Sequence, residues 1–553
     1  MDQPEKEPNG VRMEQMSPVY NGAPYVPPPD YGGAPPSILN AAVTPGAMAA
    51  PATAQGNWWS QTKLSYRQQW KKTDPAVPAQ PASLGLAATA ASLAGNFTGA
   101  GMLAMPFAFA GIGWSAIVIL PLIGVLAAFS ASLLKSCCEI LEERYEEYRR
   151  FHWYTQYSDI ASRALGPALA KVIGAQRLLC VVGLWAMALL ISADCMVDVV
   201  TILSPALAVR GYLFCGFLTG MGVVCALYSG PCAPNTRYWS YCVYLPFTLA
   251  LMILLLVGIA DNKNYADVAG GAVGAMLTLG IRDRRGDSIP AGDFLAAHSP
   301  GVLFFAGVAI IAFSFAGVCA FTNIRRDMKS PTSFTAAAAF GVAGSTLALF
   351  LVGVTGYAVL GTIINGNVVL CLKGQDIRVA ADVFALFCAQ QVSGLGYWIM
   401  DEHDSVQDYG KRVAWSRAKL ATPLALGACL LALAVPYEGA LMALVGSLAL
   451  CPVAFVLPPV FYYKLCQGSE QWPEKPLSTR MKIALAVAVV SGLLIFIGGT
   501  VTSIIQIVEQ SHLERESCLW GFCYERQFMV VQQPNIFGGL IADTLKNSKL
   551  TFG

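Results

Sequence analysis

Residues 95–102 read Gly-Asn-Phe-Thr-Gly-Ala-Gly-Met and lie in the middle of an apolar run from about 84 to 110. Three glycines and two polar side chains are unusual at the centre of a stretch that could cross a membrane. Gly costs a helix interior about 1 kcal/mol relative to Ala, so we expect the helix to be interrupted here. Non-helical backbone at membrane depth survives only where it is buried in protein or lines a cavity.

An interruption exposes two kinds of backbone group. Amides at the start of the outer half-helix suit a carboxylate, and carbonyls at the end of the inner half-helix suit an ammonium group or a cation. An amino acid zwitterion carries both groups a few bonds apart, so one broken helix offers a partner to each. The alternative is that these glycines form a helix-packing face of the small-xxx-small kind.

A second apolar run, at about 302–321, has Phe313-Ser314-Phe315-Ala316-Gly317 at its centre. Two interrupted spans at corresponding places indicate a transport site built between inverted repeats. Ser314 is expected to supply a hydroxyl, and Phe313 and Phe315 to shape a pocket for a side chain. Ordinary packing is the alternative for each of these residues.

The whole composition indicates an all-α protein that crosses the membrane many times. Of 553 residues, 55% are apolar and only 13% are charged, against roughly 25% charged in globular proteins. The net charge of +2 gives no basic excess for nucleic acid. We predict eleven spans of membrane length or nearly so, at about 84–110, 114–134, 172–203, 212–228, 239–259, 302–321, 337–360, 379–400, 420–435, 440–463 and 483–508.

These spans divide the chain into three parts. Residues 1–80 are rich in Pro and Gly and predict a disordered cytosolic tail, residues 83–508 form the eleven-span domain, and 509–553 form an outer or lumenal tail. Spans 1 to 5 and 6 to 10 would be two repeats of opposite topology, and span 11 an addition. Twenty-two Lys and Arg flank one side of the spans and eight the other, which predicts a cytosolic N-terminus and an extracellular or lumenal C-terminus.

Ionisable residues inside spans are functional hypotheses by default. Asp194 and Asp198 lie four residues apart in the outer half of the third span, where a carboxylate could take up a proton outside and release it inside. The alternative is a structural partnership with a polar group of another helix. All four histidines fall in predicted loops or tails. With no constellation of catalytic or metal-binding groups at one depth, we predict no enzyme activity, no metal and no cofactor.

Two features of the predicted tails are candidates for other roles. Pro28-Pro29-Asp30-Tyr31 follows the Pro-Pro-x-Tyr pattern that WW domains bind, although such a pattern also recurs by chance in a Pro-rich tail. Cys518 and Cys523 could form a disulfide if the C-terminal tail faces an oxidising compartment.

The first span contains a recognisable pattern, Asn96 followed by Gly-Ala-Gly-Met-Leu-Ala-Met-Pro-Phe-Ala-Phe at 99–109. This resembles the signature of the amino acid/auxin permease family. Residues 157–161, residues 164–166 and the Phe-Ser-Phe at 313–315 also look familial. Residues 441–459 are similar to the tenth helix of the vesicular inhibitory amino acid transporter branch. The resemblance covers about 83–508 and implies a LeuT-like fold of 5+5 inverted repeats plus one helix, with helices 1 and 6 broken at the midplane.

The resemblance also implies a secondary active transporter of small neutral amino acids or related amines, which works by alternating access in a plasma, vesicle or vacuole membrane. Proton coupling is favoured over sodium because the eighth span lacks an obvious Ser/Thr pair for a sodium site. The alternatives are a sodium-coupled transporter and a membrane amino acid sensor that signals through its cytosolic tail. Carried onto this chain, the residues that would meet the substrate are Asn96, Thr98, Gly99, Ala100, Gly101, Phe313, Ser314, Phe315 and Ala316.

Overall fold

The computed structural model describes residues 84–145, 148, 157–203, 236–261, 300–326, 328–361, 366–372, 374–404, 411–467, 472 and 474–515. Their named secondary-structure elements are helices, and Leu84 and Met328 form an isolated bridge. The predicted span at 212–228, the Pro-Pro-x-Tyr motif and the pair Cys518 and Cys523 lie outside the described residues.

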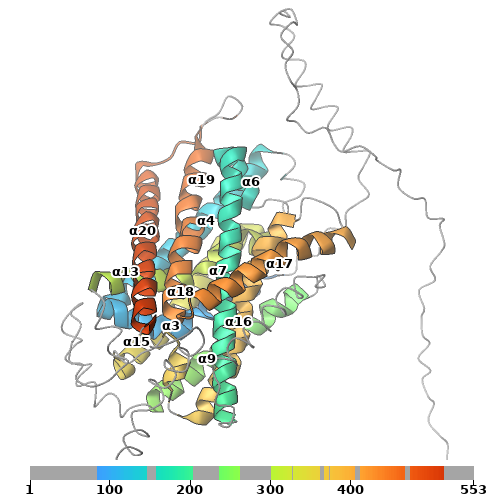
Figure 1. The fold of residues 1–553 in the computed structure, drawn as a ribbon. Coiled ribbons are helices and arrows are strands. Elements are labelled where there is room, and N and C mark those ends of the chain that lie inside the picture. The colour runs from blue at the N-terminus through green and yellow to red at the C-terminus, as the bar shows by residue number, and fades with distance from the viewer. Residues whose placement is uncertain are drawn as a thin grey trace, which may run out of the picture. The chain divides into compact units, whose positions relative to one another are not determined.

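The helices follow the apolar runs of the sequence. Figure 1 shows how these helices are arranged, coloured along the chain. Before residues 262–299, which lie outside the described part of the chain, they are α2 (Leu86–Thr98), α3 (Gly101–Ile112), η1 (Gly113–Ser115), α4 (Ala116–Arg144), α6 (Tyr157–Leu165), α7 (Pro167–Leu203) and α9 (Thr236–Asp261). After these residues they are α13 (Pro300–Ser314), η3 (Ala316–Ala320), α14 (Phe321–Arg326), η4 (Pro331–Ser333), α15 (Phe334–Leu360), η5 (Val368–Cys371), α16 (Gln375–Asp404), α17 (Lys411–Ala434), α18 (Glu438–Leu444), η6 (Val445–Leu450), η7 (Pro452–Val456), α19 (Leu457–Cys466) and α20 (Thr479–Arg515).

Seven stretches of the described chain are long and apolar enough to cross a membrane. They are Gly101–Arg144, Pro167–Leu203, Pro300–Arg325, Pro331–Leu360, Gln375–Gly396, Glu438–Cys466 and Thr479–Glu509. Leu245–Asp261 and Leu420–Ala434 are shorter apolar helices. The chain is therefore an all-helical, multi-pass membrane protein, and the number of eleven spans stays a prediction.

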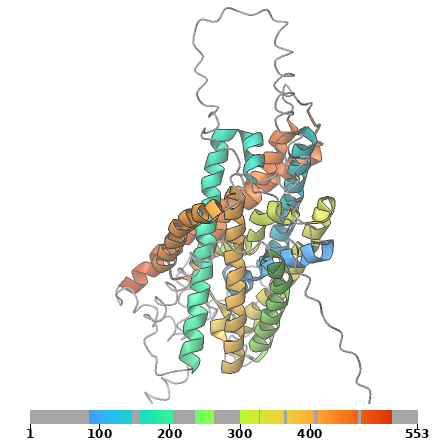
Figure 2. The same cartoon turned by 90° about the vertical axis from the view of Figure 1, so that its right-hand side faces the viewer.

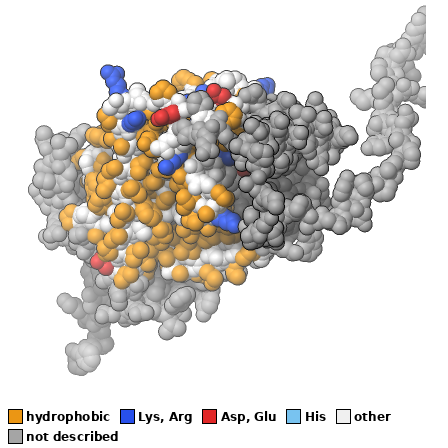
Figure 3. All heavy atoms as spheres, turned by 90° about the horizontal axis from the view of Figure 1, so that it is seen from above, with side chains coloured by type: hydrophobic (Ala, Val, Ile, Leu, Met, Phe, Trp, Pro, Cys, Tyr) orange, Lys and Arg blue, Asp and Glu red, His pale blue; other side chains and the backbone are white. Residues whose placement is uncertain are grey.

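Exposed apolar side chains identify surfaces that suit lipid. One face of α20 exposes large apolar residues every three or four positions, at Ile483, Val487, Val490, Leu494, Ile497, Val501, Ile504 and Val508. This spacing places them along one side of the helix. Seen from above, much of the described surface is hydrophobic and charged side chains are few (Figure 3). Contiguous apolar surface of this kind is typical of contact with lipid tails.

The interior of the described bundle is organised around α7 and α13. Helix α7 contacts α6, α16, α17 and η6, and α16 in turn contacts α9. Figure 2 shows α7, α16 and α9 running beside one another. Helix α13 contacts α3, α18 and α20, and α15 covers α2, α3 and α4. Residues from the N-terminal half and from the C-terminal half are thus brought together at α2, α3, α7, α13 and α16.

The stretch from α18 to α19 changes its winding midway. Its central segments η6 and η7 are π-helices on either side of Cys451. Pro452 has no amide hydrogen for the carbonyl of Leu448, four residues earlier. The Gln176 side chain amide of α7 donates to the carbonyls of Leu448 and Ala449 instead, at 2.8 and 2.9 Å. The Gln176 side chain of α7 thereby donates hydrogen bonds to backbone carbonyls of the π-helical turns.

Candidate functional site

Helix α2 ends at Thr98 and helix α3 begins at Gly101. Gly99, between them, has φ −29° and ψ −99°, outside the helical region. The amides of Met102 and Leu103 donate back to the carbonyls of Gly99 and Ala100, at 3.4 and 3.2 Å. The amides of Ala100 and Gly101 come before these bonds, at a helix start, where no preceding turn of α3 can accept from them. These amides are positioned to bind an anionic group.

The second apolar run is interrupted in the same manner. Helix α13 ends at Ser314, and Phe315 has φ −96° and ψ 22°. The Phe315 amide donates to the Ala312 carbonyl at 3.2 Å, and the chain continues as the 3₁₀-helix η3 from Ala316. The last carbonyls of α13 therefore lose their α-helical partners and can accept from a cationic donor.

The two interruptions touch each other. A Cβ added to Gly101 would lie 2.7 Å from the Cβ and 3.1 Å from the Cα of Ser314, closer than real Cβ contacts. Gly101 is therefore the residue that allows the start of α3 to lie against the end of α13. This is a packing role, the alternative that the sequence left open for the glycines, and it also brings the two sets of helix ends to one place.

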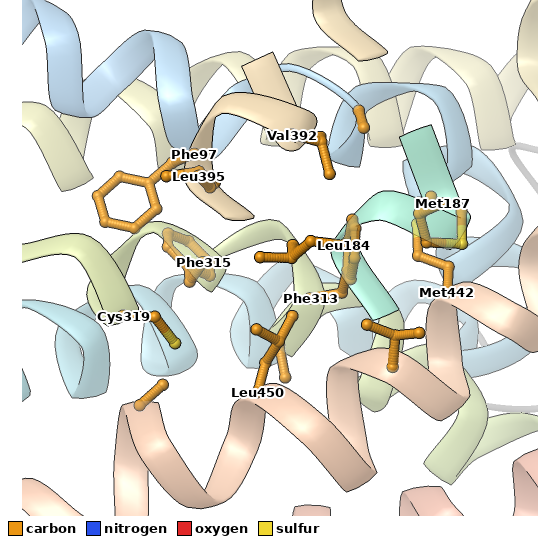
Figure 4. Packing of buried hydrophobic residues seen from close by; sticks show 14 of the residues in the cluster. Phe97, Leu184, Met187, Phe313, Phe315, Cys319, Val392, Leu395, Met442 and Leu450 are labelled. Carbon is orange, nitrogen blue, oxygen red and sulfur yellow. The ribbon is translucent and has the colours of Figure 1, made fainter. Parts of the chain in front are cut away.

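Aromatic rings lie on one side of this contact. Phe97 packs against Phe315 with ring centroids 5.7 Å apart, and against Phe321 at 5.6 Å. Gly317 leaves room for the Phe97 ring, since a Cβ there would lie 2.9 Å from it. Phe313 packs instead against η6, where a Cβ on Gly446 would lie 2.9 Å from the Phe313 Cβ. Figure 4 shows Phe97, Phe313 and Phe315 among buried side chains such as Leu184 and Met442.

The polar side chains of the two interruptions bond within their own helices. Thr98 donates to the Ala94 carbonyl at 2.5 Å, and Ser314 donates to the Ile310 carbonyl at 3.1 Å. Asn96 donates to the Ser92 carbonyl at 2.8 Å, and its side chain oxygen is buried without a hydrogen-bond partner among the described residues. Because the hydroxyl hydrogens are used in this way, the oxygens of Thr98 and Ser314 remain as acceptors.

The structure adds a residue that the sequence did not indicate. Gln391 of α16 is buried, and its Oε1 would lie 2.7 Å from a Cβ on Gly99. Its amide also bonds to Thr248 of α9, at 3.3 Å. A glutamine inside the predicted eighth span was the available signal. The described side chains of the predicted substrate residues, which exclude that of Ala316, are all buried.

A second group of polar residues surrounds Asp194 and Asp198 on α7. Arg378 of α16 forms a two-pronged ion pair with Asp198, from Nε to Oδ2 and from Nη2 to Oδ1, the latter at 2.6 Å. Asp382 of α16 lies beside Asp198, and Glu438 of α18 lies beside Asp194. All of these side chains are buried. Asp198 therefore has the structural partner that the sequence left open as an alternative.

Sequence reasoning missed three members of this group. Arg378 was placed in an outer loop, and Glu438 in the short connection between two spans. Asp382 lies within the predicted eighth span and carried the same signal as Asp194 and Asp198. Among the described residues, no three His, Cys, Asp or Glu are arranged to hold a metal ion.

Two other buried arginines have partners elsewhere. Arg177 of α7 is buried, and its guanidinium lies 5.1 Å from the centre of the Tyr157 ring. The Tyr157 hydroxyl donates to the Val453 carbonyl at 2.8 Å, and burial raises the pKa of this phenol well above its usual value. Arg325 pairs with Glu142 at 2.9 Å.

The chain matches a known family over most of its length. The family model described as transmembrane amino acid transporter protein matches residues 84–505. Amino acid transporter AVT1H of Arabidopsis thaliana is 26% identical over 387 residues, which cover 68% of this chain and 80% of that protein. Amino acid transporter AVT3C of the same plant is 25% identical over 424 residues, covering 71% and 86%.

The chain is also similar to solved structures of other proteins. A nucleobase-cation-symport-1 family transporter, MHP1, in a closed conformation with bromovinylhydantoin bound, has a TM-score of 0.47 and 15% identity, covering 82% of this chain and 99% of that one. MhsT in complex with L-phenylalanine has a TM-score of 0.44 and 12% identity, covering 74% and 98%.

Proposed function

The chain belongs to the family of transmembrane amino acid transporter proteins, and we propose that it moves small neutral amino acids or related amines across a membrane by alternating access, driven by protons. The fold we propose is LeuT-like, with spans 1 to 5 and 6 to 10 as inverted repeats. The first and sixth spans would then be the broken pair. Transport by conformational change fits a site that is buried in the described conformation.

The observation that carries the proposal is the contact between Gly101 and Ser314. We infer from this contact that the amides at the start of α3 lie near the carbonyls at the end of α13. A zwitterion needs an anion-binding and a cation-binding group a few ångströms apart, and helix ends supply both through unpaired backbone groups and the helix dipole. Two unbroken helices crossing at this point would offer neither.

Within this site we assign roles by chemistry. The amides of Ala100 and Gly101 would bind the substrate carboxylate. The carbonyls at the end of α13 and the hydroxyl oxygens of Thr98 and Ser314 would accept from the ammonium group, because their own hydrogens are already donated.

The side chains around the contact support a neutral substrate. Phe97, Phe315 and Gln391 adjoin the interruptions and carry no charge. A charged substrate side chain would lose its hydration without gaining a counter-ion there. Asn96, Gly99, Phe313 and Ala316 complete the proposed site.

For proton coupling we propose the buried carboxyls of Asp194 and Asp198. They lie on α7, which packs against α16 and η6, so a change in their charge would act on helices that also contact the substrate site. With a cytosolic N-terminus, as the distribution of Lys and Arg predicts, this end of α7 faces the outer or lumenal side. The WW ligand at Pro28, Pro29 and Tyr31 remains a separate prediction.

The test is flux through the purified full chain in proteoliposomes. Uptake of each of twenty radiolabelled amino acids would be measured with an inward proton gradient, with a sodium gradient, and with neither. We expect accumulation of small neutral amino acids only with the proton gradient. Accumulation that requires sodium would replace protons as the coupling ion, and saturable binding without any flux would favour the sensor.

A further inference from the structure

Four buried carboxyl groups and one guanidinium gather where α7, α16 and α18 meet. The acids are Asp194 and Asp198 on α7, Asp382 on α16 and Glu438 on α18. The base is Arg378, one helical turn before Asp382. We call this set the acid cluster. Fully ionised, it would hold four negative charges against one positive charge in the protein interior, which costs far more than one ion pair returns.

Arg378 is committed to Asp198 in this conformation. Two of its nitrogens donate to the two carboxyl oxygens, a geometry that fixes both side chains. The pair joins α7 to α16, and both side chains are almost fully buried. The single positive charge of the acid cluster is therefore used by one of the four acids.

Asp382 has no basic side chain paired with it in this conformation, because Arg378 bonds to Asp198. Its side chain is 0% exposed, and neither carboxyl oxygen has a hydrogen-bond partner of normal geometry among the described residues. Asp198 and the Cys195 thiol lie beside it. An ionised carboxylate buried in this way would be strongly unfavourable, so a neutral acid that carries a proton fits the position.

Glu438 and Asp194 form the other half of the acid cluster. The Asn367 side chain amide donates to Glu438 Oε1 at 3.4 Å, and the Glu438 carboxyl is within hydrogen-bonding reach of Asp194. Ionised carboxylates only accept hydrogen bonds. A hydrogen bond between these two groups therefore requires one proton on the pair, whichever residue carries it.

We propose that Asp382 is a proton-binding site and that its protonation decides whether Arg378 holds α7 to α16. When Asp382 takes up one proton, an O–H bond forms, the carboxyl becomes neutral, and Arg378 pairs with Asp198 as described here. When that proton leaves, Asp382 becomes a second carboxylate four residues from Arg378 on the same helix face, where such pairs attract. The guanidinium of Arg378 keeps its charge throughout. It moves away from Asp198 on α7 and toward Asp382 on its own helix, α16. This proposal rests on proton-driven transport, the proposed function.

The acid cluster is connected to the substrate site through one continuous stretch of chain. Glu438 begins α18, and a Cβ on the next residue, Gly439, would lie 2.7 Å from the Phe107 ring of α3. Seven residues further, Gly446 in η6 packs against Phe313 of α13. The stretch from Glu438 to Gly446 thus contains one acid of the acid cluster. It also contacts α3, which follows the first interruption, and α13, which precedes the second. A shift of α7 relative to α16 and α18 would therefore be transmitted through this stretch to α3 and α13.

A proton suits the acid cluster better than a metal ion. Arg378 already places a fixed positive charge among the carboxyls, and a metal cation would be repelled by it. The titratable or charged groups that the described neighbouring elements bring to this part of α16 are Asp194, Cys195 and Asp198 from α7, and Glu438 from α18. The exposed Asp261 lies further along, at the end of α9 near Gly374.

The experiment uses the full chain in proteoliposomes that contain the pH dye pyranine. It compares wild type with Asp382→Asn, which mimics the protonated acid. The matched control is Asp376→Asn, an exposed aspartate on the same helix. The probe is the labelled amino acid that wild type accumulates most. We expect Asp382→Asn to lose proton-driven accumulation and proton influx while still exchanging internal for external amino acid at equal pH. The control should accumulate as wild type does.

Failure of this inference and failure of the proposed function give different results. If wild type shows no proton-driven uptake, the proposed function falls. If wild type is proton-driven and Asp382→Asn remains so, with unchanged proton influx, Asp382 is not the site. Accumulation that requires sodium and is lost in Asp382→Asn would assign the acid cluster to a metal ion and overturn the proton site.

A readout without transport tests protonation itself. Infrared spectra of the purified protein at neutral pH should contain the carbonyl band of protonated carboxyl groups, and Asp382→Asn should remove part of it. An unchanged band would overturn the proposal. If Asp382→Asn does not fold, Asp382→Glu moves the carboxyl by one methylene and should shift the pH midpoint of uptake. A wild-type midpoint in a folded Asp382→Glu would contradict the proton site equally.

Discussion

Ser314 fills the space in which a side chain on Gly101 would stand, with its Cβ 2.7 Å from the position of an added Cβ. The serine Cα lies 3.1 Å from the same point, so rotating the hydroxymethyl group does not relieve the contact fully. The start of α3 and the end of α13, which are distant in sequence, are therefore in close contact at Gly101.

Gly101→Ala should reduce uptake, because the added methyl group forces α3 and α13 apart. Overpacking costs roughly 1–3 kcal/mol, or about a five- to 150-fold change, and Gly101→Leu should abolish uptake. The paired change Gly101→Ala with Ser314→Gly relieves the contact but removes the Ser314 hydroxyl from the proposed site, so it should recover thermal stability rather than flux. The control is Gly174→Ala on α7, where nothing lies within 4 Å. Wild-type uptake by Gly101→Ala would show that transport does not depend on the close contact between α3 and α13.

Gly99→Ala should be the milder of the two glycine changes. Its Cβ would lie 2.7 Å from Gln391 Oε1, the end of a flexible side chain, and 3.7 Å from the Cys388 Cβ. Gln391 can move at the cost of its bond to Thr248, so we expect an uptake loss of about fivefold, from the lower end of the overpacking range. Kinetics of Gly99→Ala with and without Gln391→Ala measure this. A larger loss than in Gly101→Ala would contradict it.

Arg378→Met should destabilise the protein strongly. Removing one partner of a buried ion pair costs about 3–5 kcal/mol, because Asp198 remains buried without its counter-charge. Thermal unfolding of the purified protein in detergent measures the effect. Lys475→Met is the contrasting control, since Lys475 and Glu143 form an exposed pair and such pairs contribute roughly 0–1 kcal/mol. Equal losses of thermal stability in the two variants would show that the buried pair of Arg378 and Asp198 contributes no more than the exposed pair.

The sequence predicted the helical, membrane-spanning character because it depends on local composition, and the same reasoning led us to expect an interruption in each of two spans. Runs of apolar residues define spans, and Gly, Ser and Thr at their centres mark weak points, as at Gly99 and Ser314. The direct contact between Gly101 and Ser314 was beyond such reasoning. It joins segments more than 200 residues apart, and only their packing reveals it.

The polar partners were harder to predict for a related reason. An aspartate within a span signals function from sequence alone, and that signal was used for Asp194 and Asp198 but was equally present for Asp382. Arg378 and Glu438 lie at the ends of predicted spans, where charge is ordinary. Their burial follows from the meeting of α7, α16 and α18, which depends on tertiary structure.

Tyr157→Phe should change how stability depends on pH. Burial raises the pKa of this phenol above its ordinary value of about 10. Its contribution to stability is therefore complete below about pH 10 and is lost as pH rises toward the raised value. The phenylalanine variant lacks the hydrogen bond to Val453 and should be about 1 kcal/mol less stable at neutral pH. The difference should shrink above pH 10 in unfolding curves, with Tyr463→Phe, an exposed tyrosine, as the control.

Gln176→Leu should destabilise the π-helical segment. The glutamine amide donates to the carbonyls of Leu448 and Ala449, and the Cys180 thiol also donates to Ala449. The variant therefore takes the side chain donor from Leu448, and leaving a partly buried acceptor without a donor costs about 1–3 kcal/mol. Gln375→Leu, at the exposed start of α16, is the matched control for thermal unfolding.

The cause of the open carbonyls can be tested by changing the proline. Pro452→Ala restores an amide that can donate to Leu448, so the effect of Gln176→Leu should be smaller in the Pro452→Ala background than in wild type. If the proline creates the need for Gln176, the two changes are coupled, and the interaction energy should fall in the range of about 0.5–3 kcal/mol seen for residues that share a partner. If the losses of stability in the two single variants simply add in the double variant, Gln176 is needed equally whether or not residue 452 has an amide hydrogen. The wide turns of η6 and η7 would then have a cause other than Pro452.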